Sequence, residues 1–494
     1  MSIVFDNSYA RDLPGAYVAW RPTQAPAPQM LFLNRALAEE LGFDAAAVDG
    51  AAGAALFSGN ALPDGAEPLA QAYAGHQFGG FSPQLGDGRA LLVGEVVDRH
   101  GQRRDIAFKG SGRTPFSRGG DGKAAVGPML REALISEAMH ALGIPTTRAL
   151  AVVATGEPVQ REVALPGAVL TRVAASHLRV GTFQYFAARG DIDGLRRLAD
   201  YAIARHDPAL ADAPDRPLAL LRAVAERQAR LIAQWMNVGF IHGVMNTDNM
   251  TISGETIDYG PCAFLEAYDP ATVFSSIDQG GRYAYGNQPL IARWNLARLA
   301  EALLPLMADA NDEAAVKQAV AQVTTVIDDF PAWYAQALLQ GQRAKLGLQQ
   351  ADDGDAALAE DFLSLLQQHA VDFTLAWRRL ADAAAGDANP LRALFAEAAA
   401  VNPWQQRWQA RAERDGGDAA QRAARMRLVN PWIIPRNHRV EEALAAASTQ
   451  LDLKPFDTLL AALRQPYDED PARSAYAQPA PAQLTAGYRT FCGT

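Results

Sequence analysis

Apolar residues recur with helical spacing over one long stretch near the middle of the chain. Leu220, Val224 and Leu231 lie roughly on one face of the segment 217–238, and this periodicity predicts a helix. Gly239 follows directly, and glycine commonly ends a helix because it adopts a left-handed backbone without strain. The pattern therefore predicts a long helix that stops at residue 238.

Shorter apolar runs before this helix have the length and residue types of strands. We predict strands at 90–97, 105–109, 149–154 and 167–173. Helical spacing predicts one helix near 30–41 and another over 129–142. Beyond Tyr259 the spacing is mostly helical, with helices predicted at 291–304, 312–327, 331–346, 356–380 and 391–398. A β-rich first part and a helical second part follow from this distribution.

The polar segment after the long helix, HGVMNTDNMTISGETIDY at 242–259, carries the first candidate chemistry. Short apolar runs on either side of a Ser-Gly-Glu turn predict a hairpin that brings Asn249 and Asp258 together. Amide and carboxylate oxygens suit a Mg²⁺ or Mn²⁺ ion that also holds phosphates. Asp248 stands beside them as a carboxylate able to take a proton. The alternative is two surface turns, since Asn, Asp and Gly are common turn residues.

The order of the elements favours nucleotide chemistry. A long helix, a His-Gly loop, Asn249, a hairpin and an Asp-Tyr-Gly sequence succeed one another as in the catalytic and metal-binding loops of the protein-kinase fold. Lys109 ends a predicted strand, and Glu132 lies in the first turn of the next predicted helix. Such a lysine–glutamate pair fixes the phosphate-binding lysine of kinases. Alternatively, Glu132 is a favourable acid at a helix N-terminus.

Glycine and basic residues are concentrated before position 131. A Gly-rich stretch at 74–94 leads into a predicted β-hairpin, where glycine lets a backbone approach a phosphate closely. The window 103–131 is basic in an acidic chain, which suits a polyphosphate or, alternatively, a solvated positive face. Its basic residues are Arg103, Arg104, Lys109, Arg113, Arg118, Lys123 and Arg131. Arg172 and Arg179 are further candidate phosphate ligands, although each taken singly is typical of a surface charge.

Composition narrows the class of protein. The 494 residues are 49% hydrophobic and 20% charged, which is enough for a large core divided between two lobes or more. The net charge of −10 argues against nucleic-acid and anionic-membrane partners. The sequence has two cysteines, no signal-peptide pattern and no apolar run of membrane-spanning length. We expect a cytoplasmic, bacterial, monomeric protein.

Six motifs spread over nearly the whole chain make it resemble the selenoprotein O family. They are GHQFG at 75–79, LGDGRA at 85–90, FKGSGRTPFSRGGDGKA at 108–124, GVMNTDNM at 243–250, IDYGP at 257–261 and NPWIIPRNH at 430–438. The resemblance implies an α+β, protein-kinase-like two-lobed fold with an N-terminal extension and a large helical C-lobe. The corresponding division is an extension at 1–84, a nucleotide-binding N-lobe at 85–180, a helical C-lobe at 181–464 and a tail at 465–494.

The resemblance also implies an activity. The family looks like a protein kinase that lost its catalytic aspartate, and Val244 stands at that position here. Such a pseudokinase binds ATP in a flipped orientation and transfers AMP to Ser, Thr or Tyr hydroxyls of proteins, releasing pyrophosphate. Phosphotransfer to a protein or small molecule is one alternative, and a non-catalytic nucleotide-binding scaffold is another. Whether UTP competes with ATP stays open.

Site residues follow from the matching motif positions. The resemblance implies that Asp248 is the proton acceptor, that Asn249 and Asp258 bind Mg²⁺ or Mn²⁺, and that Glu132 pairs with Lys109. The positions that match ATP contacts are Gly86, Gly88, Arg89, Lys109, Asp121, Gly122, Arg172, Arg179 and Asp258.

Redox control is a further hypothesis that rests on the resemblance. Some members are proposed to link a residue near the C-terminus to a cysteine of the activation segment, and the only candidates here are Cys492 and Cys262. A small buried side chain and a free thiol in the tail are the simpler alternative.

Overall fold

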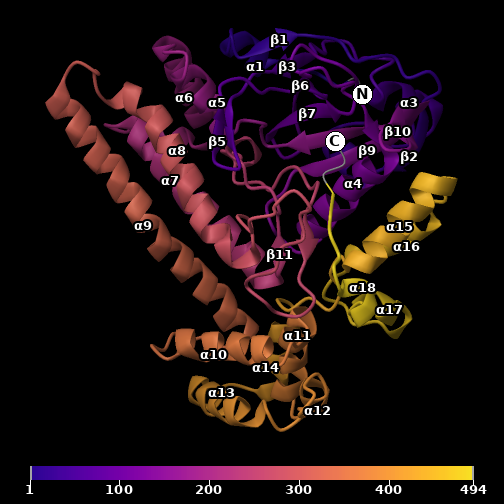
Figure 1. The fold of residues 1–494 in the computed structure, drawn as a ribbon, viewed down its shortest axis with the longest axis vertical. Helices are drawn as coiled ribbons and strands as arrows, with labels where there is room; N and C mark the ends of the chain where they lie inside the picture. Colours follow the sequence, from indigo (N-terminus) through magenta and orange to yellow (C-terminus); the bar gives the residue numbers. More distant parts are fainter. Residues whose placement is uncertain (1–2, 492–494) are drawn as a thin grey trace.

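The computed structural model, which describes residues 3–491, contains an antiparallel β-sheet and a large set of α-helices. The sheet lies at one end of the molecule and helices fill the other (Figure 1). Its strands follow the order β1-β3-β6-β7-β10-β9-β2, with β8 paired to β10, and all pairs are antiparallel. They are β1 (Tyr17–Ala19), β2 (Gln29–Leu33), β3 (Leu69–Gln71), β6 (Ala90–Val97), β7 (Arg103–Lys109), β8 (Ala124–Ala125), β9 (Arg148–Gln160) and β10 (Ala164–Ala174).

The four predicted strands are confirmed as β6, β7, β9 and β10. The helix predicted near 30–41 is wrong in its first half, because Met30 and the residues up to Leu33 belong to β2, which pairs with β9. The helical half is right: α2 (Arg35–Glu40) begins after Asn34, whose side chain accepts a hydrogen bond from the Leu37 N–H. A short apolar run suits strand or helix equally well, and the neighbouring edge of β9 decides between them.

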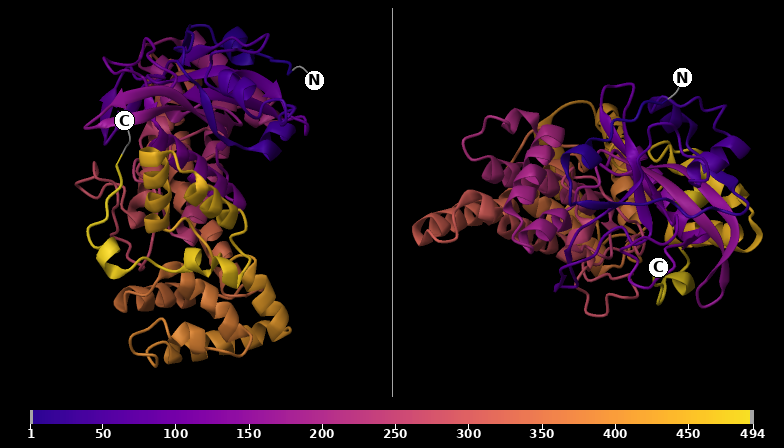
Figure 2. Two further views of the ribbon diagram at one scale, coloured as in Figure 1. Left: turned by 90° about the vertical axis from the view of Figure 1, so that its right-hand side faces the viewer. Right: turned by 90° about the horizontal axis from the view of Figure 1, so that it is seen from above.

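One helix is enclosed between the sheet and the C-terminal part of the chain. This is α4 (Val126–Ala141), which lies against β9 and β10 and against α15 (Asn437–Gln450) and α16 (Lys454–Leu463). The C-terminal helices thus return to the sheet end of the molecule (Figure 2). Because α4 begins at Val126, Glu132 lies in its second turn, so its predicted place in the first turn is wrong.

The helical part confirms the long central helix and corrects three boundaries. Its main helices are α5 (Val180–Ala187), α6 (Ile192–His206), α7 (Arg216–Val238), α8 (Gln288–Met307), α9 (Glu313–Lys345), α10 (Asp355–Gln368), α11 (Phe373–Ala384), α13 (Asn402–Asp415) and α14 (Ala419–Arg427). The single helix predicted at 356–380 is interrupted at Ala370, which has a φ of +49°. The helix predicted at 391–398 is only the short α12 (Asn389–Arg392).

The helices predicted at 312–327 and 331–346 are one continuous helix, α9, which projects from the side of the molecule (Figures 1 and 2). Pro331 lies inside it and has no N–H to donate to the carbonyl of Ile327. That carbonyl instead accepts a hydrogen bond of 3.0 Å from Arg293 Nε of α8. A side chain from a neighbouring helix thereby satisfies the group that proline leaves unpaired.

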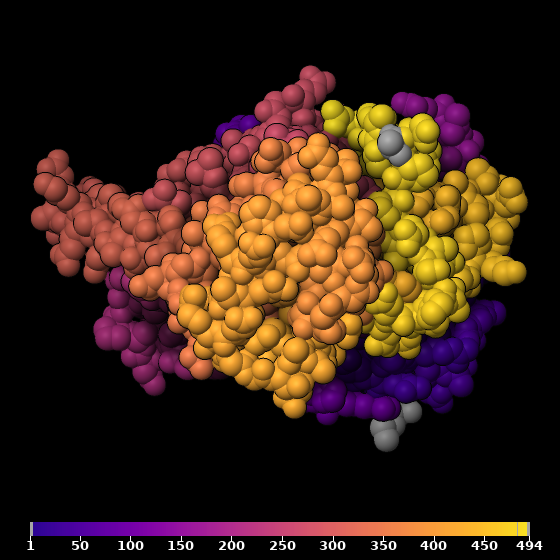
Figure 3. Space-filling view, turned by 90° about the horizontal axis from the view of Figure 1, so that it is seen from below, coloured from indigo at the N-terminus to yellow at the C-terminus, as the bar shows by residue number. Residues whose placement is uncertain are grey.

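Two hydrophobic cores hold the helical part together. One is shared by the sheet, α4 and α5–α9, and contains the long helix α7. The other belongs to α10–α14, with Trp377, Trp404 and Trp408 at its centre. Seen from below, this second group forms a compact base beside the C-terminal tail (Figure 3). Within residues 3–491, no helix combines the length and apolar character needed to span a bilayer.

Glycine at the end of α7 provides a stability test. Gly239 has a φ of +75°, and a Cβ placed there would lie 2.9 Å from a ring carbon of Phe373. We expect Gly239→Ala to lower the free energy of unfolding by about 2–3 kcal/mol, from backbone strain plus a clash. Gly143, just beyond α4, has a φ of +77° and open space around its Cβ position, so Gly143→Ala should cost only about 1 kcal/mol. Equal losses in urea denaturation would contradict the role assigned to the Phe373 contact.

Candidate active site

A cleft of about 490 Å³ opens between the sheet and the helical part. The sequence predicted twelve nucleotide-site residues, and the structure brings all of them to its walls. They are Gly86, Gly88, Arg89, Lys109, Asp121, Gly122, Glu132, Arg172, Arg179, Asp248, Asn249 and Asp258. They come from a turn before β6, the ends of β7 and β10, the residue before α5, the loop before β8, α4 and the segment that follows α7.

Asp258 is the centre of the charged groups in this cleft. Its Oδ1 accepts hydrogen bonds from Lys109 Nζ and, at 2.8 Å, from Arg172 Nη1, and its Oδ2 lies 3.6 Å from Arg179 Nη1. Burial alone would raise its pKa, but these three cations together hold the pKa well below its usual value. Asp258 has a φ of +63°, an uncommon backbone for a non-glycine residue that is typical of functional sites. The carboxylate therefore stays ionised.

The predicted pair of Lys109 and Glu132 is present. Lys109 Nζ forms a buried ion pair with Glu132, while Arg172 lies 3.8 Å from the other oxygen of the same carboxylate. Three cations, Lys109, Arg172 and Arg179, thus face three buried or largely buried carboxyl groups, because Asp87 lies 4.0 Å from Arg179 in addition to Glu132 and Asp258. Over the whole wall of the cleft, seven Lys and Arg side chains stand against five Asp and Glu side chains, and this excess of basic residues favours an anionic ligand such as a polyphosphate.

Asp248 is a buried carboxyl group on the wall of the cleft. Its Oδ2 accepts a hydrogen bond of 3.2 Å from Gln77 Nε2, and its buried Oδ1 has no hydrogen-bond partner among the described residues. The backbone carbonyl of Asp248 accepts a hydrogen bond of 3.0 Å from Arg179 Nη1. Burial, opposed by the nearby Arg179, raises the pKa of Asp248 to about 6. A carboxylate of raised pKa with one free oxygen is suited to accept a proton.

The hairpin predicted between Asn249 and Asp258 is wrong. Every residue of this segment is described and no strand forms within it; Thr251 bridges to Arg179 and Thr256 bridges to Thr146. The N–H of Ile252 donates to Leu178 O, so the backbone groups that a hairpin would pair are used by other segments. Both halves are instead anchored separately to the chain at 145–147 and 178–180, and the loop still delivers both side chains to the cleft.

The residues present fit a divalent metal ion held jointly with phosphates. Among residues 3–491 no group of three or more His, Cys, Asp and Glu side chains forms a metal site. Asn249 Nδ2 donates a hydrogen bond of 3.0 Å to Val244 O, which anchors the amide. Asp258 stays ionised, and its Oδ2 accepts no hydrogen bond from these residues. One amide and one carboxylate oxygen, completed by phosphate and water, match the sparse protein ligation typical of Mg²⁺.

The basic window divides into two groups. Lys109, Arg118 and Lys123 line the cleft, and the others serve the fold. Arg103 and Arg104 form ion pairs with Asp6, Glu95 and Asp98, whereas Arg113 and Arg131 donate mainly to backbone carbonyls. The prediction that the whole window faces a polyphosphate is therefore wrong, because β7 points its first residues away from the cleft.

Glycine permits the close approach of the loops that form the cleft wall. Gly122 has a φ of +68°, and a Cβ there would lie 2.1 Å from the carbonyl oxygen of Gly112. Gly86 has a φ of +123° and would clash with Phe116. The backbone next to Asp121 and Lys123 can therefore border the cleft directly, as the Gly-rich motif predicted.

Sequence reasoning missed four contributors. Arg161 lines the cleft and pairs with Asp121 at 2.9 Å. Gln77 contacts Asp248, and Tyr73 lies under the Arg179 guanidinium, 4.6 Å from ring centroid to Cζ. Asp87 lies 4.0 Å from Arg179. Gln77 and Asp87 belong to motifs that had been recognised, GHQFG and LGDGRA, so the motifs themselves were the available signal.

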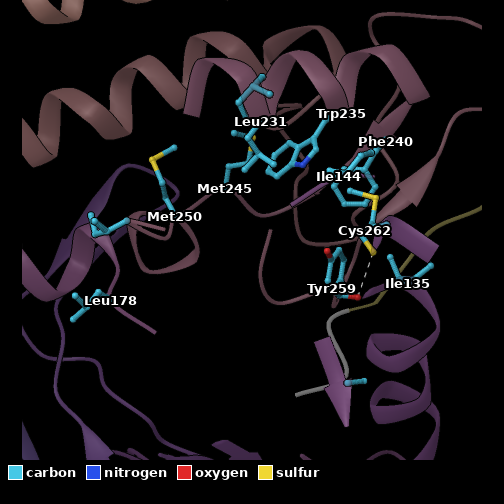
Figure 4. Packing of buried hydrophobic residues seen from close by; sticks show 14 of the residues in the cluster. Ile135, Ile144, Leu178, Leu231, Trp235, Phe240, Met245, Met250, Tyr259 and Cys262 are labelled. Carbon is cyan, nitrogen blue, oxygen red and sulfur yellow. Dashed lines mark hydrogen bonds between the residues drawn. The ribbon is translucent and has the colours of Figure 1, made fainter. Parts of the chain in front are cut away.

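Cys262 lies outside this cleft, in a hydrophobic cluster with Tyr259, Phe240 and Trp235 (Figure 4). It is fully buried, its Sγ is 3.4 Å from Tyr259 O, and burial raises the pKa of its thiol to about 12. A thiol in this state is poorly reactive. Cys492 lies outside the described residues, although Thr490 contacts Pro261 O, next to Cys262. A redox role for the two cysteines stays a prediction.

Comparison with known proteins gives consistent matches along the chain. The family model described as "Protein adenylyltransferase SelO" matches residues 1–464. A relative named protein nucleotidyltransferase YdiU from Cereibacter sphaeroides strain KD131 is 63% identical over the full length of both chains. Relatives of the same name from Chromobacterium violaceum and Rhizobium johnstonii are 62% and 59% identical, covering 98% and 99% of this chain and 100% and 97% of their own.

The loop between Asn249 and Asp258 makes a pH-dependent contribution to stability. Burial raises the pKa of Glu255 from 4.5 to about 7, although its carboxylate accepts hydrogen bonds from Ala175 N and Ser253 Oγ. The unfolded chain therefore loses this proton near pH 4.5 and the folded chain near pH 7, so stability falls as the pH rises through that window. Between pH 5 and pH 8 we expect the free energy of unfolding of wild type to fall by about 1–3 kcal/mol more than that of Glu255→Gln, because glutamine has no proton to lose.

Urea denaturation at pH 5, 6, 7 and 8 checks this expectation. Glu360→Gln, which changes an exposed glutamate of α10, is the matched control and should follow the wild-type pH dependence. Parallel curves for wild type and Glu255→Gln would contradict the burial of the Glu255 carboxyl.

Proposed function

The chain belongs to the SelO family of protein adenylyltransferases, and we propose that the cleft around Asp248 and Asp258 carries out the transfer of AMP from ATP to a protein hydroxyl. One observation carries the proposal: a buried carboxylate, Asp248, stands in a cleft whose walls carry seven basic and five acidic side chains. A proton acceptor next to a polyphosphate site is the arrangement that transfer from a nucleotide needs.

The cations act on the phosphates. Lys109, Arg172 and Arg179 exchange their contacts with Asp258 for phosphate oxygens when ATP binds. Arg118 and Lys123 on the opposite loop hold the β- and γ-phosphates as the leaving group, so that the α-phosphorus is the atom presented to the acceptor. This is the flipped orientation of ATP, and it is supported by the cationic residues that line the cleft on the side of the Gly-rich loop.

The acceptor is a Ser, Thr or Tyr hydroxyl of a protein. Its oxygen attacks the α-phosphorus and forms a new P–O bond, while the bond from that phosphorus to the oxygen bridging to the β-phosphate breaks. Pyrophosphate leaves with the electron pair of the broken bond, and the hydroxyl proton passes to Oδ1 of Asp248. The net charge of −10 supports proteins rather than nucleic acids as acceptors, and we propose a monomer that works in the cytoplasm.

Asn249 and Asp258 would hold Mg²⁺ or Mn²⁺. A bound divalent ion supplies neutralisation of phosphate charge. The chain's own part is to keep Asp258 ionised and Asn249 fixed through its hydrogen bond to Val244 O. We also propose that the arrangement of Lys109, Glu132, Asn249 and Asp258 reflects a protein-kinase-like fold.

Transfer of the γ-phosphoryl group is the second candidate. The order of loops around Asn249 and Asp258 is that of a kinase, which favours it. Val244, however, lines the cleft at the position of the kinase aspartate and cannot take a proton. Asp248 would have to serve a γ-phosphorus instead, so nucleotidyl transfer agrees better with the residues present.

Labelling with ATP separates the two reactions. With Mg²⁺ or Mn²⁺, we expect label from α-³²P-ATP but not from γ-³²P-ATP to appear on the protein itself or on casein, read on a denaturing gel. EDTA should abolish the label and added Mg²⁺ or Mn²⁺ should restore it. Label from the γ position would identify a kinase, and binding of ATP without label from either position would identify a scaffold.

Replacement of the two aspartates tests their roles. Asp248→Asn should reduce the rate of α-label transfer by about 10²–10⁴-fold, because the amide cannot take the proton. Asp258→Asn should lose most activity and respond less to added metal. Asp415→Asn removes another buried carboxylate, far along the chain in α13, and should retain the wild-type rate. Thermal unfolding must show each variant folded; near wild-type turnover in Asp248→Asn would contradict its assignment.

A further inference from the structure

A small hairpin lies directly over the catalytic segment. It consists of β4 (Gly75–Gln77) and β5 (Gly80–Ser82), which pair antiparallel. Its backbone and side chains bind three successive residues of that segment: Phe78 N donates to Asn246 Oδ1 at 3.1 Å, His76 N to Thr247 Oγ1 at 2.7 Å, and Gln77 Nε2 to Asp248 Oδ2 at 3.2 Å. The hairpin is therefore tied directly to the segment that carries Asp248.

The tip of this hairpin contains an unfavourable residue. Phe78 has a φ of +51° and Gly79 a φ of +88°, the two positive values of a tight turn in which Asn-Gly is the favoured pair. A bulky aromatic residue in the left-handed region is an outlier, and such strain is concentrated at functional sites. Asparagine would adopt this backbone conformation with less strain, so the turn alone does not explain why an aromatic residue occupies position 78.

Three exposed apolar side chains belong to this hairpin or lie in the cleft beside it. Phe78, Phe81 and Ile277 are 42%, 44% and 46% exposed, and we call these three residues the acceptor face. Phe78 and Ile277 line the cleft, whereas Phe81 does not and contacts His76 at 4.8 Å between ring centroids. Tyr283, held by Asp278 next to Ile277, supports the Phe78 ring at 5.2 Å.

The position of the acceptor face indicates what covers it. The groups suited to phosphates lie on the Lys109 and Gly-rich side of the cleft, and a nucleobase would cover only the part of the patch inside it. Phe81, on β5 of the same hairpin, is exposed outside the cleft, where an acceptor protein could reach it and a nucleobase held in the cleft could not. Asp248 lines the cleft together with Gln77 and Phe78 of the hairpin, so an acceptor hydroxyl that reaches its carboxylate through the cleft passes next to the hairpin.

We propose that the acceptor face docks a segment of the acceptor protein that carries an apolar side chain next to the modified hydroxyl. This inference rests on the proposed function and specifies its substrate class. Gln77 is a positioning residue that orients Asp248, while Phe78 and Ile277 select the neighbour of the hydroxyl. The hairpin thereby links recognition of the acceptor to placement of the base.

Two synthetic peptides test the proposal with the full-length protein. Both contain one serine; leucine flanks it in one peptide and glycine in the other, and the remaining residues are identical. Transfer from α-³²P-ATP is measured with wild type, Phe78→Asn, Ile277→Asn and the control Leu428→Asn, which changes an exposed leucine after α14. For each protein, kcat/KM is determined for both peptides, together with the KM for ATP and the Tm.

Wild type should prefer the leucine peptide by about tenfold, as expected for partial burial of one apolar side chain. Phe78→Asn and Ile277→Asn should bring this ratio close to one with the KM for ATP unchanged, and Leu428→Asn should keep the wild-type ratio. Phe78→Asn should also have an unchanged or higher Tm, because asparagine tolerates the positive φ. If a variant with an unchanged Tm loses the preference for the leucine peptide, the loss is due to recognition of the acceptor and not to impaired folding.

Three results would overturn the proposal. The first is an equal rate on both peptides by wild type, and the second is a raised KM for ATP with the preference retained, which would assign the patch to the nucleobase. The third is label on neither peptide. If wild type then still labels itself or casein, the proposed function stands and only the acceptor face is refuted; if it labels nothing, both fall.

Discussion

The ion cluster around Asp258 is the interaction on which the rest of the site depends. Its members come from β7, α4, β10, the residue before α5 and the loop after α7, so the sheet and the helical part meet in one set of charges. Buried charges at such a junction are stable only when all partners are present and oriented. With Lys109, Arg172 and Arg179 facing Glu132, Asp258 and Asp87, the cluster itself is balanced, and the excess of basic over acidic side chains belongs to the cleft wall as a whole. That excess is the physical basis for binding a polyphosphate.

A second buried network, behind the first, orients Arg172. His177 Nε2 accepts a hydrogen bond of 3.2 Å from Arg172 Nε, and its Nδ1 lies 2.9 Å from Asp105 Oδ2. Arg205 in turn binds Asp105 and Glu95. Burial lowers the pKa of His177, so the neutral ring can accept from Arg172 while it donates to Asp105. Asp105 of β7 thus positions a cation at the cleft through His177, although Lys109, at the other end of the strand, is the residue of β7 that lines the cleft.

The first 84 residues contribute directly to both the sheet and the cleft. They provide β1, β2 and β3 of the sheet, and the β4–β5 hairpin that contacts residues 246–248. Phe78, at the tip of the hairpin, has a positive φ that an aromatic residue rarely adopts. Asp258 also has a positive φ, and this backbone directs its carboxylate into the ion cluster. In both places an unfavourable φ is held by surrounding hydrogen bonds, and the side chain that it directs lies at the cleft.

Local sequence determined much of the architecture and most of the site membership. Hydrogen bonding within a helix and the alternation of a strand depend on neighbours in sequence. Local signals therefore include the period of α7 and the glycine after it, the apolar runs of β6, β7, β9 and β10, and the motifs that end these elements. Tertiary structure decided which backbone the segment 250–257 pairs with, how α9 continues through Pro331, and which basic residues of the window 103–131 reach the cleft. It also decided that Gln77 contacts Asp248. Each of these depends on a partner distant along the chain, and no local pattern of side chains specifies which distant group will supply the missing hydrogen bond or charge.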